Sequence, residues 1–272
     1  MKKKIISIVT VVVLLFTTVT TYAANVDSGN LTINNGEYYE DEQGNICVTN
    51  EVSELDLIKE LLKNDDQTLI EMGYSKEEIK LYKDFVSQSK SRGAKVTTGK
   101  ITYTVKWYKD YFKYSNGKTY LRSNFSWSWS TKPVAVKTDI VAMGTNENFA
   151  VKNSSASAHV NYYLNGIKDT AHKTVISQNV YTKANGTCAY TKFVMLKTRE
   201  PGPQLKYALG GSMTVDWVKN GNIKTVAIGG NYGHTTKKIN PSVSVDISGL
   251  SISFSPQNAV SSGPEALVNA YR

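Results

Sequence analysis

Groups that could perform acid–base or nucleophilic chemistry are sparse in this sequence and lie far apart. A hydrolase needs two carboxylates held a few ångströms apart in a cleft, or a histidine that activates a nucleophile. Asp169 and His172 are close in the chain, and the segment Tyr-Gly-His-Thr around His234 could line a pocket, but neither spacing requires a site. Residues 94–272 hold only eight carboxylates, of which four could meet in a fold: Asp139, Glu147, Asp169 and Asp216.

The same scarcity argues against a metal site. The two cysteines, Cys47 and Cys188, are far apart, and His159, His172 and His234 lack the spacing of metal ligands. We therefore expect no metal, no cofactor and no catalytic residue, and keep a secreted hydrolase as a third hypothesis. In an exported protein two cysteines either form a disulfide or remain separate thiols, and the sequence leaves both alternatives open.

The N-terminus predicts export. Lys2, Lys3 and Lys4 precede an apolar run over residues 5–16, and Thr-Tyr-Ala ends at residue 23. This order is typical of a secretory signal peptide over residues 1–23, and the apolar run is too short for a membrane span. We expect a secreted, extracellular bacterial protein.

Charge divides the rest of the chain in two. Residues 25–93 carry a formal balance of −8, whereas residues 94–272 carry +14. We predict a flexible acidic segment over residues 24–52, a short helical region over 53–93 and a basic domain over 94–272. Three features support the helical region. Apolar residues recur at helical spacing at Leu55, Ile58, Leu61 and Leu62. Gly73 can end a helix, and Ser75 with Glu78 can form a capping box.

From Lys95 onward the apolar residues alternate with polar ones, as in strands. Asn-Gly pairs at 116, 165, 185 and 220, with Ser-Gly at 248, separate these runs, and Asn-Gly is a strong signal for a hairpin turn. Hairpins make neighbouring strands antiparallel. The fold class predicted is therefore mainly β: an antiparallel β-sandwich of about ten hairpin-linked strands, preceded by the short helical region.

Aromatic and basic residues are concentrated on the first two runs, over residues 99–130. The aromatics either form a ligand-contact face or line the inside of the sandwich, since alternation with serine fits both. The candidate ligand-binding residues are Trp107, Tyr111, Tyr114, Phe125, Trp127, Trp129, Lys106 and Lys113. The charge of the domain attracts anionic partners, and the excess of lysine over arginine indicates diffuse attraction. No nucleic-acid motif is present, so nucleic acid is not an expected partner.

Opposite charges should also bring the acidic N-terminal arm onto the basic domain of its own chain. The arm is then either a permanent cap or a pro-segment that masks the binding surface until the connector over residues 90–95 is cut.

The segment over residues 242–256 is amphipathic, with Val243, Ile247 and Phe254 on one side and serines on the other. Pore-forming β-hairpins share this pattern, but each side here has seven residues and a spanning strand needs about 9 to 11. We predict a sandwich edge with its valine side inward. The function predicted is non-catalytic binding to a cell-envelope, anionic or glycan surface, with a membrane-active, pore-forming or bacteriocin-like toxin as the alternative.

Overall fold

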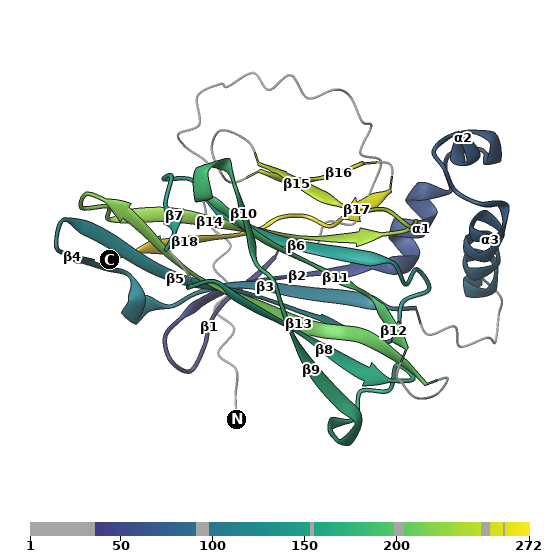
Figure 1. The fold of residues 1–272 in the computed structure, drawn as a ribbon, viewed down its shortest axis with the longest axis horizontal. Helices are drawn as coiled ribbons and strands as arrows, with labels where there is room; N and C mark the ends of the chain where they lie inside the picture. Colours follow the sequence, from purple (N-terminus) through teal and green to yellow (C-terminus); the bar gives the residue numbers. More distant parts are fainter. Residues whose placement is uncertain (1–35, 91–97, 153–154, 199–203, 246–250, 258) are drawn as a thin grey trace.

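The computed structural model describes residues 36–90, 98–152, 155–198, 204–245, 251–257 and 259–272 (Figure 1). The predicted signal peptide, most of the 90–95 connector and the Ser248-Gly249 turn lie outside the described residues. The described part consists mainly of antiparallel strands, so the predicted fold class is confirmed.

The larger of two main sheets has ten strands. Its continuous path, in spatial order, is β1 (Glu37–Glu40), β2 (Ile46–Ser53), β3 (Lys100–Trp107), β5 (Lys118–Trp129), β13 (Leu205–Asn220), β8 (Ser157–Leu164) and β9 (Lys173–Gln178). Three short strands pair off this path: β4 (Lys113–Ser115), β7 (Ala150–Val151) and β12 (Leu196–Thr198).

The smaller main sheet has six strands. Its path is β10 (Tyr181–Lys183), β11 (Cys188–Val194), β6 (Thr138–Thr145), β14 (Thr225–Thr235) and β17 (Val260–Ser262), and β18 (Ala266–Tyr271) also pairs with β14. Three single-turn 3₁₀ helices complete the connections: η1 (Lys109–Tyr111), η2 (Thr170–His172) and η3 (Ala184–Gly186).

The two sheets pack face to face, and alternate residues of their strands fill the space between them. The indole of Trp129 donates a hydrogen bond to the hydroxyl of Tyr232 at 3.1 Å, across the two sheets, and Trp217 donates to Ser123 at 2.8 Å. These bonds satisfy the polar tips of large buried rings, which otherwise cost free energy when removed from water.

Turn chemistry follows the sequence at most positions. The Asn-Gly pairs at 116, 165 and 185 have positive φ at both residues, as a type I′ turn requires. At the fourth pair only Gly221 has positive φ, at 95°. Local sequence therefore specified three of these four turns.

The prediction of a flexible segment over residues 24–52 is wrong for residues 37–52. Within this range residues 37–40 form β1 and residues 46–52 belong to β2, which pairs with β3 along its whole length. Val48 and Val52 enter the core, while Glu51 remains exposed, so its negative charge lies on the outer face of β2. The ten-stranded sheet thus crosses the charge boundary near residue 94, and residues 24–35 lie outside the described part.

Residues 54–90 form three short helices that we call the helical layer: α1 (Glu54–Leu61), α2 (Asp66–Glu71) and α3 (Lys76–Lys90). The capping box is present, because the backbone N–H of Glu78 donates to Ser75 Oγ at 3.1 Å and that of Ser75 donates to Glu78 Oε2 at 3.0 Å. Gly73 has a φ of 92° at the end of α2. In the described part of the chain, none of the helices combines the length and the apolar character of a membrane-spanning helix.

The helical layer packs onto the sandwich at one end, at the right of Figure 1. Its apolar cluster includes Ala135, which precedes β6. Tyr82 donates a hydrogen bond to the carbonyl of Thr236, and Lys137 forms an ion pair with Glu78 at 2.6 Å. The predicted contact between the N-terminal arm and the β domain is therefore present in the structure.

The amphipathic segment forms a separate two-stranded sheet, β15 (Ser242–Val245) and β16 (Ile252–Ser255). Val243, Ile252 and Phe254 are buried against Ile140 and Ala142 on the outer side of the six-stranded sheet. The apolar side is inward, as expected. The predicted position is corrected, because the hairpin covers a sheet face instead of extending a sheet edge.

Candidate surface-binding site

The predicted aromatic contact face lies mostly inside the protein. Trp107, Phe125, Trp127 and Trp129 are at most 3% exposed, because β3 and β5 direct these positions toward the six-stranded sheet. Cross-strand pairing of Tyr103 with Trp127 keeps their side chains on this same inner face. For these four rings the expectation of a contact surface is corrected: they are core residues.

The other predicted aromatics are exposed. Tyr111 and Tyr114 are 42% and 44% exposed, because η1 interrupts the alternation of β3 and sends the chain around the end of the sheet. The Asn116-Gly117 turn then returns β4 along β5. Binding by these two residues and by the exposed Lys113 remains a prediction.

Three segments far apart in the sequence meet at this end. The N–H of Gly221 donates to the carbonyl of Gly117 at 2.8 Å, and the N–H of Arg272 donates to the carbonyl of Lys224 at 3.1 Å. The guanidinium of Arg272 lies 5.6 Å from the ring of Tyr114. We call this surface the tyrosine–cation patch; its members are Tyr108, Lys109, Tyr111, Lys113, Tyr114, Lys118, Arg122, Lys224, Tyr271 and Arg272.

Cations stack on several of the tyrosines. The guanidinium of Arg122 lies 3.9 Å from the ring centroid of Tyr111, and Lys106 Nζ lies 4.7 Å from that of Tyr108. Arg122 also forms a bidentate pair with Asp216, at 2.5 and 2.9 Å. Hydrogen bonding to Asp216 is the main cause that raises the pKa of Arg122 above its usual range. This pairing fixes the Arg122 side chain as a support for Tyr111.

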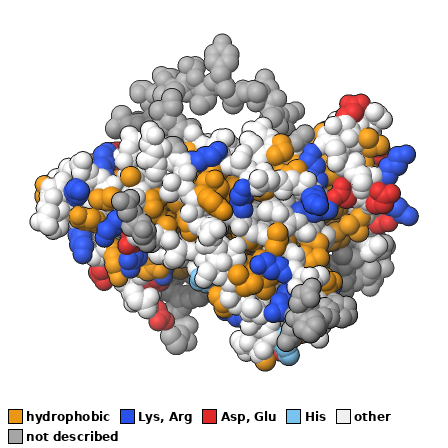
Figure 2. Space-filling view, viewed as in Figure 1, with side chains coloured by type: hydrophobic (Ala, Val, Ile, Leu, Met, Phe, Trp, Pro, Cys, Tyr) orange, Lys and Arg blue, Asp and Glu red, His pale blue; other side chains and the backbone are white. Residues whose placement is uncertain are grey.

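Most cations of the patch are not neutralised. No carboxylate of the described residues lies within ion-pair distance of five of them: Lys109, Lys113, Lys118, Lys224 and Arg272. By contrast, Lys106, predicted as a site residue, pairs with Asp41 at 3.2 Å on the outer face of the sheet. Figure 2 shows lysine and arginine side chains, with fewer acidic ones among them, around the left end of the molecule, where β4 and the C-terminus lie. This end therefore presents net positive charge together with exposed rings.

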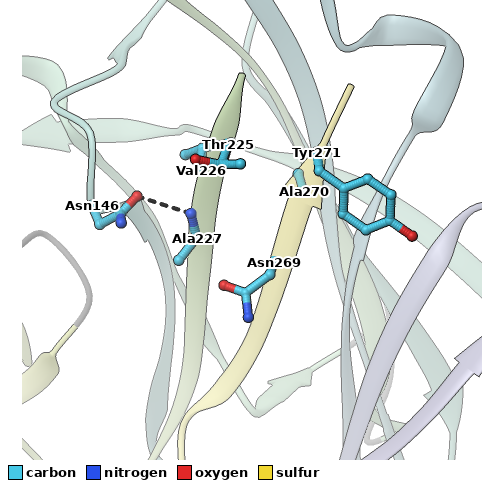
Figure 3. Close-up of a pocket in the computed structure, with 7 residues that line it drawn as sticks. All are labelled: Asn146, Thr225, Val226, Ala227, Asn269, Ala270 and Tyr271. Atoms are coloured by element: carbon cyan, nitrogen blue, oxygen red, sulfur yellow. Dashed lines mark hydrogen bonds between the residues drawn. The ribbon is translucent and has the colours of Figure 1, made fainter. Parts of the chain in front are cut away.

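A pocket of about 240 Å³ lies beside the patch (Figure 3). It is lined by Asn146, residues 225–227 and residues 269–271. Asn146 Oδ1 accepts a hydrogen bond from the N–H of Ala227 at 2.8 Å, so this side chain continues the sheet where β6 has ended. Tyr271, 64% exposed, belongs to both the pocket and the patch. Asn269 and Tyr271 are both exposed positions of β18, and the pocket that they line lies next to the cations of the patch.

The strongest electrostatic feature is buried and was not predicted. Asp139 Oδ2 accepts hydrogen bonds from the hydroxyl of Tyr232 at 2.6 Å and from His234 Nδ1 at 2.9 Å. On its other side, His234 Nε2 lies 3.5 Å from Glu54 Oε1, and Glu54 also accepts from the N–H of Ala135 at 2.9 Å. We call Glu54, Asp139 and His234 the buried triad.

The triad joins the helical layer to the sandwich. Glu54 is the first residue of α1, whereas Asp139 and His234 lie on β6 and β14. Burial opposes a charge on His234, but the carboxylates of Asp139 and Glu54 outweigh it and raise the pKa of His234 to about 10. The imidazolium therefore carries its charge between two carboxylates at neutral pH.

The triad is not placed for catalysis. All three side chains are at most 1% exposed, so a substrate cannot reach His234 in this structure. The carboxylates considered for a hydrolase do not meet either, since Asp169 pairs with His172, Glu147 with Lys219 and Asp216 with Arg122. Within the described ranges, no cluster of three His, Cys, Asp or Glu residues is arranged to hold a metal ion.

Cys47 and Cys188 are both buried free cysteines, so the disulfide alternative is not present in the structure. Cys47 pairs across strands with Lys106 on the outer face of the ten-stranded sheet. Cys188 lies under the β15–β16 hairpin, outside the six-stranded sheet. The whole core separates the two thiols, and burial raises the pKa of Cys188 to about 12.

The fold and site together define an antiparallel β-sandwich with a docked helical layer and a cationic, tyrosine-bearing end. No protein-family model matches the chain, and no curated protein matches it. Among solved structures it is similar to a protein titled pore forming protein, with 8% identity over 86% of this chain and 94% of that one, at a TM-score of 0.27. The delta-toxin of Clostridium perfringens matches with 8% identity over 87% and 92%, at a TM-score of 0.24.

A third similar structure is the collagen binding domain of the Erysipelothrix rhusiopathiae surface protein RspB. It is 10% identical over 65% of this chain and 66% of that one, with a TM-score of 0.23. These TM-scores are too low to carry an argument about function, which therefore has to come from the patch itself.

Proposed function

We propose that this protein is a secreted, non-catalytic protein that binds anionic lipid membranes through the tyrosine–cation patch. One observation carries the proposal: five cations without a carboxylate partner surround three tyrosines that are 42% to 64% exposed. Both kinds of group suit the boundary of a bilayer, where phosphates lie next to hydrocarbon.

Cations supply the larger share of the binding free energy. A lysine or arginine held near an anionic leaflet contributes about 1 kcal/mol, so the five unpaired cations supply about 5 kcal/mol. Between vesicles with and without anionic lipid, this corresponds to roughly a thousandfold difference in affinity or more. The attraction should weaken as salt is added.

The tyrosines distinguish a bilayer from a soluble polyanion. A tyrosine ring enters the headgroup region with its hydroxyl directed to water, which stabilises binding to a membrane. A teichoic acid or another flexible polyanion engages the same cations without needing the exposed rings. Loss of binding on removal of the rings is therefore specific to the membrane proposal.

Vesicle co-sedimentation tests the proposal. The wild-type protein should bind vesicles that contain phosphatidylglycerol and should not bind pure phosphatidylcholine. Tyr114→Ser combined with Tyr271→Ser should reduce binding to anionic vesicles about tenfold or more and leave binding to soluble polyphosphate unchanged. Equal binding to both kinds of vesicle would refute the proposal, and so would a tyrosine variant that binds as the wild type does.

A second candidate function is membrane insertion by the β15–β16 hairpin. Among the described residues the hairpin pairs with neither main sheet, and its buried apolar residues cover the six-stranded sheet with serines on the other side. Lys183 Nζ donates to the carbonyl of Val243 at 2.8 Å, and Asn231 donates to that of Ile252 at 3.3 Å. Each strand has four residues, whereas a spanning strand needs about 9 to 11, so insertion would require extension of both strands.

Release of an encapsulated dye separates the two functions. Binding to anionic vesicles without dye release supports surface attachment alone. Dye release would show that the protein breaches the bilayer, and a Phe254→Ser variant should then release dye less because the hairpin has lost its largest apolar side chain.

A further inference from the structure

The ten-stranded sheet ends in two strands that have one neighbour each. In the part of the chain that the structure describes, β1 pairs only with β2 and β9 pairs only with β8. Such a strand presents a row of backbone N–H and C=O groups to solvent, and proteins either block it or use it to pair with another chain. For each of these two edges the question is therefore whether it is blocked or pairs with another chain.

The two edges have opposite charge. All four residues of β1, Glu-Tyr-Tyr-Glu, are exposed, and no cation of the described residues pairs with Glu37, Glu40 or Glu42. The β9 edge has the exposed Lys173 at its start, and no carboxylate of the described residues forms an ion pair with it. The β1 edge is therefore negative and the β9 edge positive, so the two edges are complementary in charge.

Exposed apolar and aromatic side chains accompany the charges at both edges. Beside the β9 edge, Val175 is 56% exposed and Ile167 is 67% exposed, and β9 contains no proline. At the other edge Tyr38 and Tyr39 are both exposed. Aliphatic side chains at one edge and tyrosines at the other are groups that protein interfaces use in their centres.

One chain cannot join its own edges. Seven strands lie along the path from β1 to β9, so at a spacing of about 4.8 Å the edges are about 29 Å apart. A two-fold symmetric dimer would place like charges opposite each other. Complementary pairing requires a head-to-tail arrangement, in which one edge of each copy meets the other edge of the next.

We infer that the partner of these edges is a second copy of this chain: β1 of one copy pairs with β9 of the next and continues the ten-stranded sheet. The acidic residues of β1 then lie against Lys173 of β9. Because both edges of every copy are used, the assembly grows into rings or filaments. The inference does not depend on membrane binding, and its test uses the protein in solution.

Charge exchange between the edges tests this arrangement by sedimentation velocity at low salt. The wild type should form dimers and larger species as concentration rises. Lys173→Glu and Glu40→Lys should each weaken association about tenfold or more, because like charges then meet at every interface. The double variant with both changes, and an equimolar mixture of the two single variants, should associate as the wild type does.

Matched controls carry the same charge changes on the exposed face of α3. Lys80→Glu and Asp84→Lys should associate as the wild type does, and circular dichroism should show that all variants are folded. A wild type that remains monomeric up to about 100 µM, well within the range of weak protein interfaces, would overturn the inference. It would also be overturned if the double variant or the mixture failed to regain association, or if the controls lost it to the same extent.

Discussion

Replacing His234 with glutamine should destabilise the protein strongly at neutral pH and far less near pH 10. In the wild type the imidazolium lies between Asp139 and Glu54, all three with at most 1% exposure. Glutamine removes the positive charge and leaves two carboxylates buried without a cation. Such a loss from a buried ion cluster costs about 3 to 5 kcal/mol.

The shift in the pKa of His234 corresponds to a change of the same size in the free energy of unfolding. Folding raises this pKa from 6.5 to about 10. Each unit corresponds to about 1.4 kcal/mol, so the whole shift is worth about 5 kcal/mol in favour of the folded state. Because the folded-state pKa is the higher one, this stabilisation is complete below pH 6.5 and is lost as the pH rises through 10.

The assay is urea unfolding of both proteins at several pH values from about 6 to about 9.5. The difference in the free energy of unfolding between wild type and His234→Gln should shrink by up to about 1.4 kcal/mol per pH unit above neutrality. Comparing the two proteins cancels the titration of shared groups that lie away from the substituted side chain. A control, His172→Gln, removes a histidine whose pair with Asp169 is exposed, and should change stability by less than about 1 kcal/mol at every pH.

A difference between wild type and His234→Gln that stays constant with pH would refute this reasoning. It would mean that the imidazole is neutral in the folded protein and contributes through packing. A difference that increases above neutral pH would show the opposite pH dependence to the one expected, and would also refute this reasoning.

Three further predictions concern the core and the thiols. Trp127→Ala should lower the free energy of unfolding by about 3 to 5 kcal/mol, whereas Tyr111→Ala should change it by less than about 1 kcal/mol, as measured by urea unfolding. Gly230→Ala should cost about 1 to 3 kcal/mol and lower the melting temperature, because its Cβ would lie 2.5 Å from a valine methyl of the opposite sheet. The melting temperature should be the same with and without reductant, and the mass of the denatured protein should show Cys47 and Cys188 both as thiols; a mass lower by two hydrogens would contradict this.

Local signals in the sequence predicted local structure well. The capping box at Ser75 and Glu78 and three of the four Asn-Gly turns are present where residue type demands them. The antiparallel arrangement followed from these turns, because short turns leave no room for a crossover. Structure that depends only on a few neighbouring residues could therefore be predicted from the sequence.

The local sequence did not show which of a strand's two faces is buried. Alternation places Trp127 and Trp129 on one side, but nothing in a single strand says which side meets a second sheet. A clue was available at Tyr111, where Tyr-Lys-Asp-Tyr-Phe-Lys-Tyr departs from alternation and therefore leaves the sheet. The segment over residues 46–53 was obscured by its acidic neighbours, although Val48 and Val52 keep the spacing of a strand.

The buried triad depends on three distant parts of the chain, at residues 54, 139 and 234, and no local pattern joins them. A histidine at the end of a strand made of small and apolar residues was the available signal. The choice between a disulfide and two separate thiols was left open for the same reason, because two cysteines in a sequence do not say on which outer face of a sandwich each will lie.

The position of the helical layer bears on the idea that the N-terminal arm masks the binding surface. In Figure 1 the helices lie at one end of the sandwich, whereas β4 and the C-terminus, which carry the patch, lie at the other. The helical layer is also tied to the sandwich through the buried triad. These contacts favour a permanent cap over a pro-segment that covers the tyrosine–cation patch.

The most direct test of membrane attachment by this patch is the affinity of one charge variant for vesicles that contain phosphatidylglycerol. Lys109→Ala, Lys113→Ala and Lys118→Ala together should lower that affinity about a hundredfold, at about 1 kcal/mol for each cation removed. A control variant with three lysines of α3 changed to alanine, at positions 76, 80 and 90, should bind as the wild type does. Equal loss in both variants, or no loss in the patch variant, would contradict the account.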